Sequence, residues 1–182
     1  MVVHERGHEE GRGKSLKKAA VEALVQTLES RDGMARQQAR ERLVAIGRVA
    51  ARHLAKGLTD DRKYVRWEAA KALADIRDKE SAVDLVKSLE DPEFDIRWLA
   101  AKGLIARRRD SLKPLFIALE HHADSEWLRD GAHHVLHALS KQGLRESVVS
   151  VVAALEGRAP SITVPNAAKE ALDRLRAGGR VS

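Results

Sequence analysis

The chain has 182 residues and a formal net charge of +6 at pH 7, with 43% hydrophobic residues and only 3% aromatic ones. This length suffices for one domain with a core and is too short for two large ones. Cysteine is absent, which excludes disulfides and thiolate metal sites. Because no run of about 18 uncharged apolar residues occurs, we expect no membrane-spanning helix.

The chain begins MVVHERGHEEGRGK, a stretch rich in glycine and charge with no apolar core of signal-peptide length. Together with the absence of cysteine, this predicts a cytoplasmic protein. We expect residues 1–14 and 178–182 to be flexible tails. His4-Glu5-Arg6-Gly7-His8 matches the letters of the zinc-protease pattern HExxH. The neighbouring glycines do not favour the buried helix that this chemistry needs, so we interpret the match as accidental.

After the first tail, apolar residues recur with the spacing i, i+3, i+4, i+7, which places them on one face of a helix. This pattern occurs five times, at Val21-Leu24-Val25-Leu28, Ala51-Leu54-Ala55-Leu58, Ala82-Leu85-Val86-Leu89, Leu112-Leu115-Phe116-Leu119 and Val148-Val151-Val152-Leu155. The closing leucines are 30, 31, 30 and 36 residues apart. Self-similarity at a nearly fixed period predicts a repeat architecture.

A second helix is predicted after each of these, with three anchor residues four apart. The anchors are Ala35-Ala39-Leu43, Val65-Ala69-Leu73, Ile96-Ala100-Leu104, Leu128-Ala132-Leu136 and Val164-Ala168-Leu172. The middle anchor is alanine in every copy. A small side chain at this position allows two helices to approach closely, as a tightly stacked hairpin requires.

These patterns predict helices at about 16–29, 33–46, 48–58, 63–76, 80–89, 92–106, 111–120, 126–139, 145–156 and 165–176. Asp91-Pro92 is typical of an N-cap followed by proline at the first helical position, and Pro165 is expected to open the last helix in the same way. The expected fold is all-α, an α-solenoid of five antiparallel helix pairs over residues 15–177.

The segments VRWEAAKALADI (65–76) and IRWLAAKGL (96–104) resemble the short HEAT-like repeats first described in phycobilin lyases, and the resemblance covers roughly residues 16–176. It implies a helical stack but no single function, because the same repeat serves scaffolds, lyase subunits, hydroxylases and DNA glycosylases. Deoxyhypusine hydroxylase holds two irons with His–Glu pairs on its repeat helices. No such pair occurs in the repeat helices here, which excludes that activity.

An arginine follows the first anchor in four of the five second helices, at Arg36, Arg66, Arg97 and Arg129. One interpretation is a ladder of guanidinium groups for phosphate or carboxylate ligands. The interpretation that we favour is structural, with each arginine tying the turn of its repeat to the neighbouring repeat, as HEAT-like repeats commonly do.

His133, His134 and His137 lie together on the second helix of the fourth repeat. His133 and His137 are four residues apart and could share a metal ion, but no acidic residue or cysteine stands at a suitable spacing beside them. We therefore expect a solvated or partner-facing surface, which could respond to pH. With no glycine-rich phosphate loop and no GxSxG motif, the sequence predicts no catalytic, cofactor or metal site.

In repeat solenoids the face opposite the first helices lines a concave groove. Residues two, five, six and nine positions after each first anchor lie on this face, and they include two tryptophans at one position and two lysines at another. The predicted partner-binding groove consists of Trp67, Lys71, Trp98, Lys102, Asp130, His133, His134 and His137, with Trp127 close by. Exposed aromatic side chains of this kind are typical binding hot spots. Alternatively, the rings fold onto neighbouring helices and seal the stack.

The positive charge is concentrated in the first third of the chain. Residues 14–57 contain ten Lys or Arg against four Asp or Glu. The predicted basic patch consists of Arg36, Arg40, Arg48, Arg52 and Lys56, near Arg42. A basic end of this kind attracts nucleic acid, acidic proteins or anionic membrane surfaces.

Together these features predict a non-catalytic interaction module or scaffold that binds a protein or peptide through the groove of the solenoid. Two alternatives remain at the level of the sequence. One is nucleic-acid binding through the basic first third, which high salt would weaken steeply. The other is a phycobilin-lyase-like subunit, which the resemblance alone implies.

Overall fold

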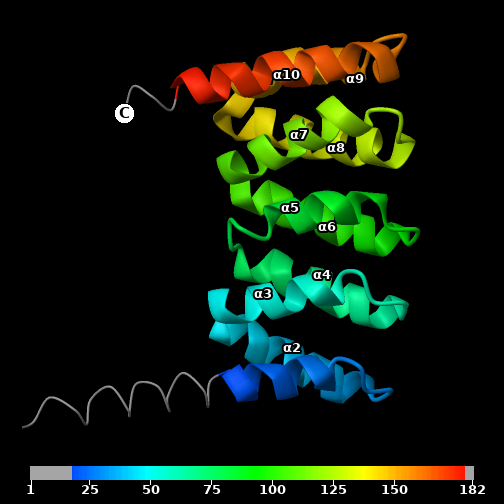
Figure 1. Cartoon of the computed structure of the whole chain (residues 1–182), viewed down its shortest axis with the longest axis vertical. Helices are drawn as coiled ribbons and strands as arrows, with labels where there is room; N and C mark the ends of the chain where they lie inside the picture. The colour runs from blue at the N-terminus through cyan, green and yellow to red at the C-terminus, as the bar shows by residue number, and fades with distance from the viewer. Residues whose placement is uncertain (1–17, 179–182) are drawn as a thin grey trace, which may run out of the picture.

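The computed structural model describes residues 18–178, and over these residues the chain is helical with no β-strand. Helix pairs stack one upon another along the longest axis of the molecule, with the chain passing from one end of the stack to the other (Figure 1). The predicted all-α solenoid is therefore confirmed. The tail predicted over 1–14 and the His4–His8 match lie outside the described residues. Of the tail predicted over 178–182, only Gly178 is described, as the last residue of a helix.

The helices follow the predicted order closely. A helix over residues 18–27 opens the described region. It is followed by α2 (Gly33–Ile46), α3 (Arg48–Gly57), α4 (Lys63–Ile76), α5 (Ala82–Lys87), α6 (Phe94–Arg107), α7 (Leu112–His122), α8 (Glu126–Leu139), α9 (Arg145–Leu155) and α10 (Pro160–Gly178). Short 3-10 turns follow α5 (Ser88–Glu90) and α6 (Arg108–Ser111), and a π-type segment (Ser140–Leu144) joins α8 to α9.

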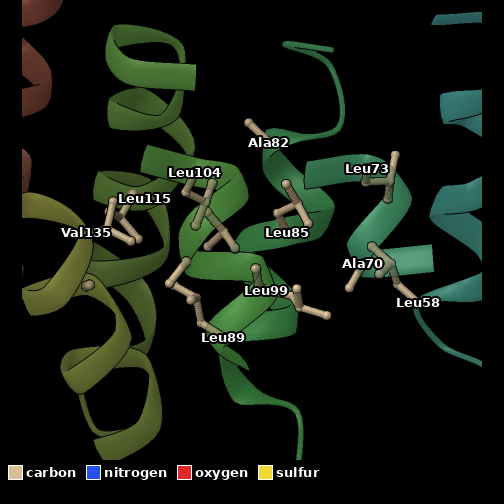
Figure 2. Packing of buried hydrophobic residues seen from close by; sticks show 14 of the residues in the cluster. Leu58, Ala70, Leu73, Ala82, Leu85, Leu89, Leu99, Leu104, Leu115 and Val135 are labelled. Carbon is tan, nitrogen blue, oxygen red and sulfur yellow. The ribbon is translucent and has the colours of Figure 1, made fainter. Parts of the chain in front are cut away.

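The core is built from leucines and small side chains at the helix crossings. The five middle-anchor alanines are all at most 2% exposed: Ala39, Ala69, Ala100, Ala132 and Ala168. Figure 2 shows leucines of successive helices meeting between the ribbons. The approach is close enough that a Cβ added to Gly57 of α3 would lie 3.0 Å from the Ala69 Cβ of α4. The predicted apolar faces therefore meet, and small residues determine how closely.

Successive second helices pack side by side: α2 against α4, α4 against α6, and α6 against α8. We call their outer surface the second-helix face. The final pair departs from this order, because α10 packs against α7 and α9, whereas α9 packs against α8. The last pair is thus reversed, and α9, not α10, continues the second-helix layer. This differs from the prediction, which placed the Val164-Ala168-Leu172 helix in that layer.

The junctions from each second helix to the next first helix all contain a residue with positive φ. These residues are Gly47 (φ 74°), Arg77 (56°), Arg108 (53°) and Gly143 (91°). Glycine adopts this region without steric cost, whereas an arginine does so with strain. The Arg108 side chain offsets part of this strain, because its Nη2 donates to the Gln142 carbonyl at 2.7 Å and so joins two successive junctions.

A buried arginine fastens the junction between α4 and α5. Arg107 is 6% exposed, and its guanidinium donates to the carbonyls of Leu73, Asp78 and Gly103 and to the Ser81 hydroxyl, at 2.7 to 2.8 Å. Burial lowers the pKa of Arg107 to about 10, so the group stays charged at neutral pH. Its guanidinium thus joins the end of α4, the turn before α5 and the α6 helix through their backbone carbonyls.

Two predicted helix starts are wrong. The α6 helix begins at Phe94 with Glu93 as its N-cap, and the carboxylate of Asp91, the predicted N-cap, accepts from the Glu93 amide at 2.9 Å and pairs with Arg66. The last helix begins at Pro160, and Pro165 lies inside it. Proline is favoured at the first helical position, and Pro160 takes that position, which leaves Pro165 to interrupt one hydrogen bond of the second turn.

Replacing Ala100 with leucine tests the close crossing of the second helices. The larger side chain has no space at a position that is fully buried, so we expect a loss of about 1–3 kcal/mol of unfolding free energy from overpacking. Chemical denaturation followed by circular dichroism measures this loss. The control is Ala153→Leu at an exposed position of α9, which should leave stability nearly unchanged. Equal stability of the two variants would contradict the crossing.

Replacing Arg77 with glycine tests the strained junction. Its left-handed backbone (φ 56°, ψ 30°) costs an arginine more than a glycine, so Arg77→Gly should raise the unfolding free energy by roughly 0.5–1 kcal/mol. The reciprocal change, Gly47→Ala at φ 74° and ψ −135°, should lower it by more than about 1 kcal/mol. Thermal unfolding of both variants shows whether Arg77→Gly raises and Gly47→Ala lowers the stability. Destabilisation by Arg77→Gly would contradict the expected strain at Arg77.

Candidate partner-binding surface

The arginine ladder has a structural role in this fold. In Arg36, Arg66, Arg97 and Arg129 alike, Nη1 donates to the two carbonyls six and five residues earlier, at 2.7 to 3.2 Å. These carbonyls belong to the turn that opens the same helix. Arg66 also reaches the next repeat, through an ion pair with Asp91 at 2.7 Å. The guanidinium groups are therefore engaged inside the protein, chiefly with their own turns.

The aromatic side chains gather on the second-helix face. The chain contains six aromatic residues in all, and of these only Phe116 is buried in the core. The other five lie on α4, α6 and α8: Tyr64, Trp67, Phe94, Trp98 and Trp127. Phe94 is 70% exposed, and Trp98 and Trp127 are each 46% exposed. An aromatic-poor protein thus places most of its rings where they contribute little to the core.

On α4 the rings are covered by arginines of the preceding repeat. The Arg36 guanidinium lies over Tyr64, with Cζ 4.8 Å from the ring centroid, and that of Arg40 lies over Trp67 at 5.6 Å. Both arginines also pair with the Glu68 carboxylate, which is buried between them. Trp67 packs partly against the core. The ring of Trp67 therefore seals the joint between two repeats, as the alternative interpretation of the tryptophans proposed.

Between α6 and α8 the face is hollowed. The hollow has a volume of about 150 Å³ and is lined by Phe94, Arg97, Trp98, Ala101, Trp127, Asp130, Gly131 and His134. We call it the Trp98 hollow. Its floor is made of small residues, because Ala101 is buried and Gly131 packs so closely that an added Cβ would lie 2.9 Å from Leu89. Its walls are aromatic, and Asp130 contributes a carboxylate.

Neighbouring groups hold the aromatic walls in place. The Arg97 guanidinium is fixed by the carbonyls of Asp91 and Pro92 and lies 4.8 Å from the centroid of Trp127. On the opposite side, the rings of Trp98 and His134 lie 5.0 Å apart at 39°. Ring positions fixed before binding reduce the entropy that a partner must overcome, so the hollow is preorganised.

The eight predicted groove residues do not form one continuous site. Trp98, Asp130 and His134 line the Trp98 hollow, whereas Trp67 lines a separate, more open depression with Tyr64. Lys71 pairs with Asp75 on its own helix at 3.1 Å, and Lys102 is exposed on α6 outside the hollow. The predicted row of two tryptophans and two lysines is thus divided, and the binding role of its members stays a prediction.

The remaining histidines meet α9 at the reversed last pair. His133 Nε2 lies 3.0 Å from the Glu156 carboxylate, and the rings of His133 and His137 are stacked with centroids 5.9 Å apart. Within residues 18–178, no group of three or more histidine, cysteine or acidic side chains has a geometry suited to a metal ion. The structure thus places His133 beside the carboxylate of Glu156, the residue that caps the C-terminus of α9.

Four members of the predicted basic patch pair with carboxylates of the following repeat. Besides the pairing of Arg36 and Arg40 with Glu68, Arg48 pairs with Asp78 and Glu80, and Arg52 lies 3.2 Å from Glu80. The hydrogen bonds from Arg48 and Arg52 lower the pKa of Glu80. Lys56 is exposed on α3. Much of the positive charge is thus balanced within the protein, which gives nucleic-acid binding less support than the sequence did.

The sequence analysis did not predict that Phe94 and Arg97 line the hollow, and it placed Trp127 only close to the groove. Phe94 stands two residues before its helix's first anchor, a position at which the first, second and fourth copies carry no large apolar residue. An unexplained apolar residue at the start of a second helix was thus the available signal. Arg97 and Trp127 lie about 30 residues apart in the sequence and meet only because neighbouring repeats pack together. The sequence alone does not show this contact.

Comparison with known families matches residues 51–137 to HEAT repeats. No curated protein matched the sequence. The same helix pairs continue on both sides of the matched segment, so the fold of the described residues resembles a stack of HEAT-like repeats. HEAT repeats commonly mediate protein interactions and are generally non-catalytic scaffolds. Among the described residues, no helix has the length and apolarity needed to cross a bilayer.

The three tryptophans should differ in accessibility and in their contribution to stability. Variants that keep one tryptophan and carry phenylalanine at the other two positions isolate each indole. Iodide should quench Trp98 and Trp127, which are each 46% exposed, more strongly than Trp67, which packs partly against the core. Trp67→Ala should cost about 2–3 kcal/mol of unfolding free energy, and Trp98→Ala about 1 kcal/mol or less. Equal quenching and equal costs would show that the hollow is closed in solution.

Proposed function

We propose that this protein is a non-catalytic interaction module that binds a segment of a protein or peptide through its second-helix face, centred on the Trp98 hollow. The observation that supports this most is the exposure of Phe94, Trp98 and Trp127 around one hollow. Tryptophan and other aromatic residues are enriched at the energetic centres of protein interfaces. On a chain with so few rings, leaving three of them partly in solvent favours a binding role.

The size of the hollow favours a side chain over a small-molecule cofactor. Pockets for drug-sized ligands commonly enclose about 300–1,000 Å³, whereas the Trp98 hollow measures about 150 Å³. A hollow of this size holds one side chain of a partner, with the rest of the partner lying across the helices. The ridged surface of α4, α6 and α8 offers such a segment an extended track.

The position of the hollow within the stack also supports this proposal. It lies between α6 and α8, away from both ends of the repeat array, where neighbouring repeats hold each helix on two sides. A binding site on rigid, doubly supported helices loses little conformational entropy when it is occupied. Beyond α8 the second-helix layer continues with α9.

Selection from a displayed library of random peptides tests the proposal while the natural partner is still unidentified. The immobilised full-length protein serves as bait, and recovered peptides are measured against wild type and Trp98→Ala by fluorescence anisotropy. We expect Trp98→Ala to weaken binding at least about tenfold, which corresponds to a hot-spot contribution above about 1.4 kcal/mol. The melting temperature should change little, which separates lost contact from lost fold.

Val83→Ala is the matched control, because Val83 is 52% exposed on α5, outside the second-helix face. Peptides that depend on the hollow should bind this variant as tightly as wild type. If the recovered peptides bind Trp98→Ala and wild type equally, the second-helix face is not the binding surface. Recovery of peptides sensitive to Val83→Ala instead would place binding on the first helices.

A further inference from the structure

Two repeat joints of the same solenoid can be compared position by position. At the joint between α2 and α4, the residue after the middle anchor of α2 is Arg40, and the residue before the middle anchor of α4 is Glu68. The Arg40 guanidinium lies over the Trp67 ring, with Cζ 5.6 Å from the centroid, and pairs with the Glu68 carboxylate. This joint therefore contains a guanidinium placed between an aromatic face and a carboxylate.

At the joint between α6 and α8, both of these side chains are missing. The residue after the middle anchor of α6 is Ala101, where α2 has Arg40, and the residue before the middle anchor of α8 is Gly131, where α4 has Glu68. Ala101 and Gly131 both line the Trp98 hollow. The hollow is thus bordered by Ala101 where α2 has Arg40, whereas at Gly131 an added Cβ would lie 2.9 Å from Leu89.

The groups that would receive an arginine are nevertheless present. Trp98 and Trp127 supply aromatic surface, each 46% exposed. Asp130 supplies a carboxylate at the wall of the hollow, and it takes part in no ion pair within residues 18–178. An exposed carboxylate beside aromatic faces attracts a cation both by charge and through the ring quadrupole.

We infer that the Trp98 hollow binds the guanidinium of an arginine side chain presented by a partner peptide, with its plane on the Trp98 ring and its charge paired with Asp130. This inference rests on the proposed function and specifies the partner chemistry. Its support is that the hollow has Ala101 where α2 has Arg40 and is lined by the exposed Trp98 ring and the Asp130 carboxylate. These two groups stand at other repeat positions than the aromatic ring and carboxylate of the first joint, because Trp98 corresponds to Gln37 and Asp130 to Trp67.

Arg97 provides a second precedent for this chemistry. Its own guanidinium lies 4.8 Å from the centroid of Trp127 and 5.7 Å from that of Phe94, at the wall of the same hollow. Arg97 already donates to the carbonyls of Asp91 and Pro92, whereas Asp130 is left for the incoming group. A planar guanidinium stacks on a ring while it donates to a carboxylate in its own plane, which a lysine ammonium does less well.

Nuclear magnetic resonance of the three tryptophan indole N–H groups tests the inference on the full-length protein. The signals are assigned with single Trp→Phe variants. The probe is N-acetyl-arginine amide, and N-acetyl-citrulline amide is the uncharged control of the same shape. Binding of one side chain should be weak, with a dissociation constant on the order of 10 mM.

We expect arginine amide to shift the Trp98 signal saturably. The Trp67 signal should not shift, because that ring is partly buried and Arg40 lies over it. The Trp127 signal should shift less than that of Trp98, because Arg97 already lies over the Trp127 ring. Citrulline amide should shift none of them saturably. Asp130→Asn should weaken binding about five- to tenfold. Ala101→Arg should abolish it by filling the hollow from within, as Arg40 does at the other joint. Because Ala101 is buried, the Ala101→Arg variant could lose its fold, so its binding result counts only if its melting temperature equals that of wild type. If the melting temperature falls, Asp130→Asn alone tests the inference.

Three results would overturn the inference. Equal shifts from arginine and citrulline would mean that the hollow takes a planar group regardless of charge. Unchanged affinity in Asp130→Asn would remove the carboxylate from the site. Absence of any saturable Trp98 shift, while displayed peptides still bind in a Trp98-dependent way, would reject arginine as the occupant and leave the proposed function intact. If no displayed peptide depends on Trp98, the proposed function itself fails.

Discussion

Close approach of helices at a small side chain is the constraint on which the rest of this structure depends. Ala69 and Ala100 illustrate it, since both are fully buried, and a Cβ added to Gly57 of α3 would lie 3.0 Å from the Cβ of Ala69. Packing at this distance favours interdigitated leucines and excludes large rings from most of the core. Phe116 is the one aromatic residue that the core accommodates. Alanine at the middle anchor therefore determines both the spacing of the stack and the composition of its interior.

The distribution of the aromatic residues follows from that constraint. Rings that do not fit between closely spaced helices lie on the outer surface of the second helices, where their role depends on the neighbouring repeat. Trp67 is covered by Arg40 and joins two repeats, whereas Trp98 has an alanine and a glycine beside it and remains half exposed. The same residue type at the same repeat position thus contributes to stability in one joint and to a surface hollow in another.

Arginine side chains form many of the polar interactions that hold this fold together. Arg36 and its equivalents hold the turn that opens each second helix, and the buried Arg107 satisfies carbonyls at a junction between repeats. In addition, Arg36 and Arg40 pair with Glu68, and Arg48 and Arg52 pair with Glu80. These ion pairs balance positive charge that the composition alone presents as an excess. The high basic content of the first third therefore reflects internal pairing with the next repeat at least as much as a surface for an anionic partner.

The sequence by itself determined the helix pairs, their order and the buried anchors, because apolar periodicity and small residues act within single helices and recur at each repeat. It located Trp98 and Asp130 on an outer face for the same reason. Only the tertiary structure decided that α10 packs on α7 instead of α8, that Arg40 covers Trp67, and that Phe94 and Arg97 complete the hollow. These features depend on contacts between side chains about 30 residues apart, which meet where two repeats pack together. Apolar periodicity does not show that Trp67 is covered by a neighbouring side chain while Trp98 is exposed.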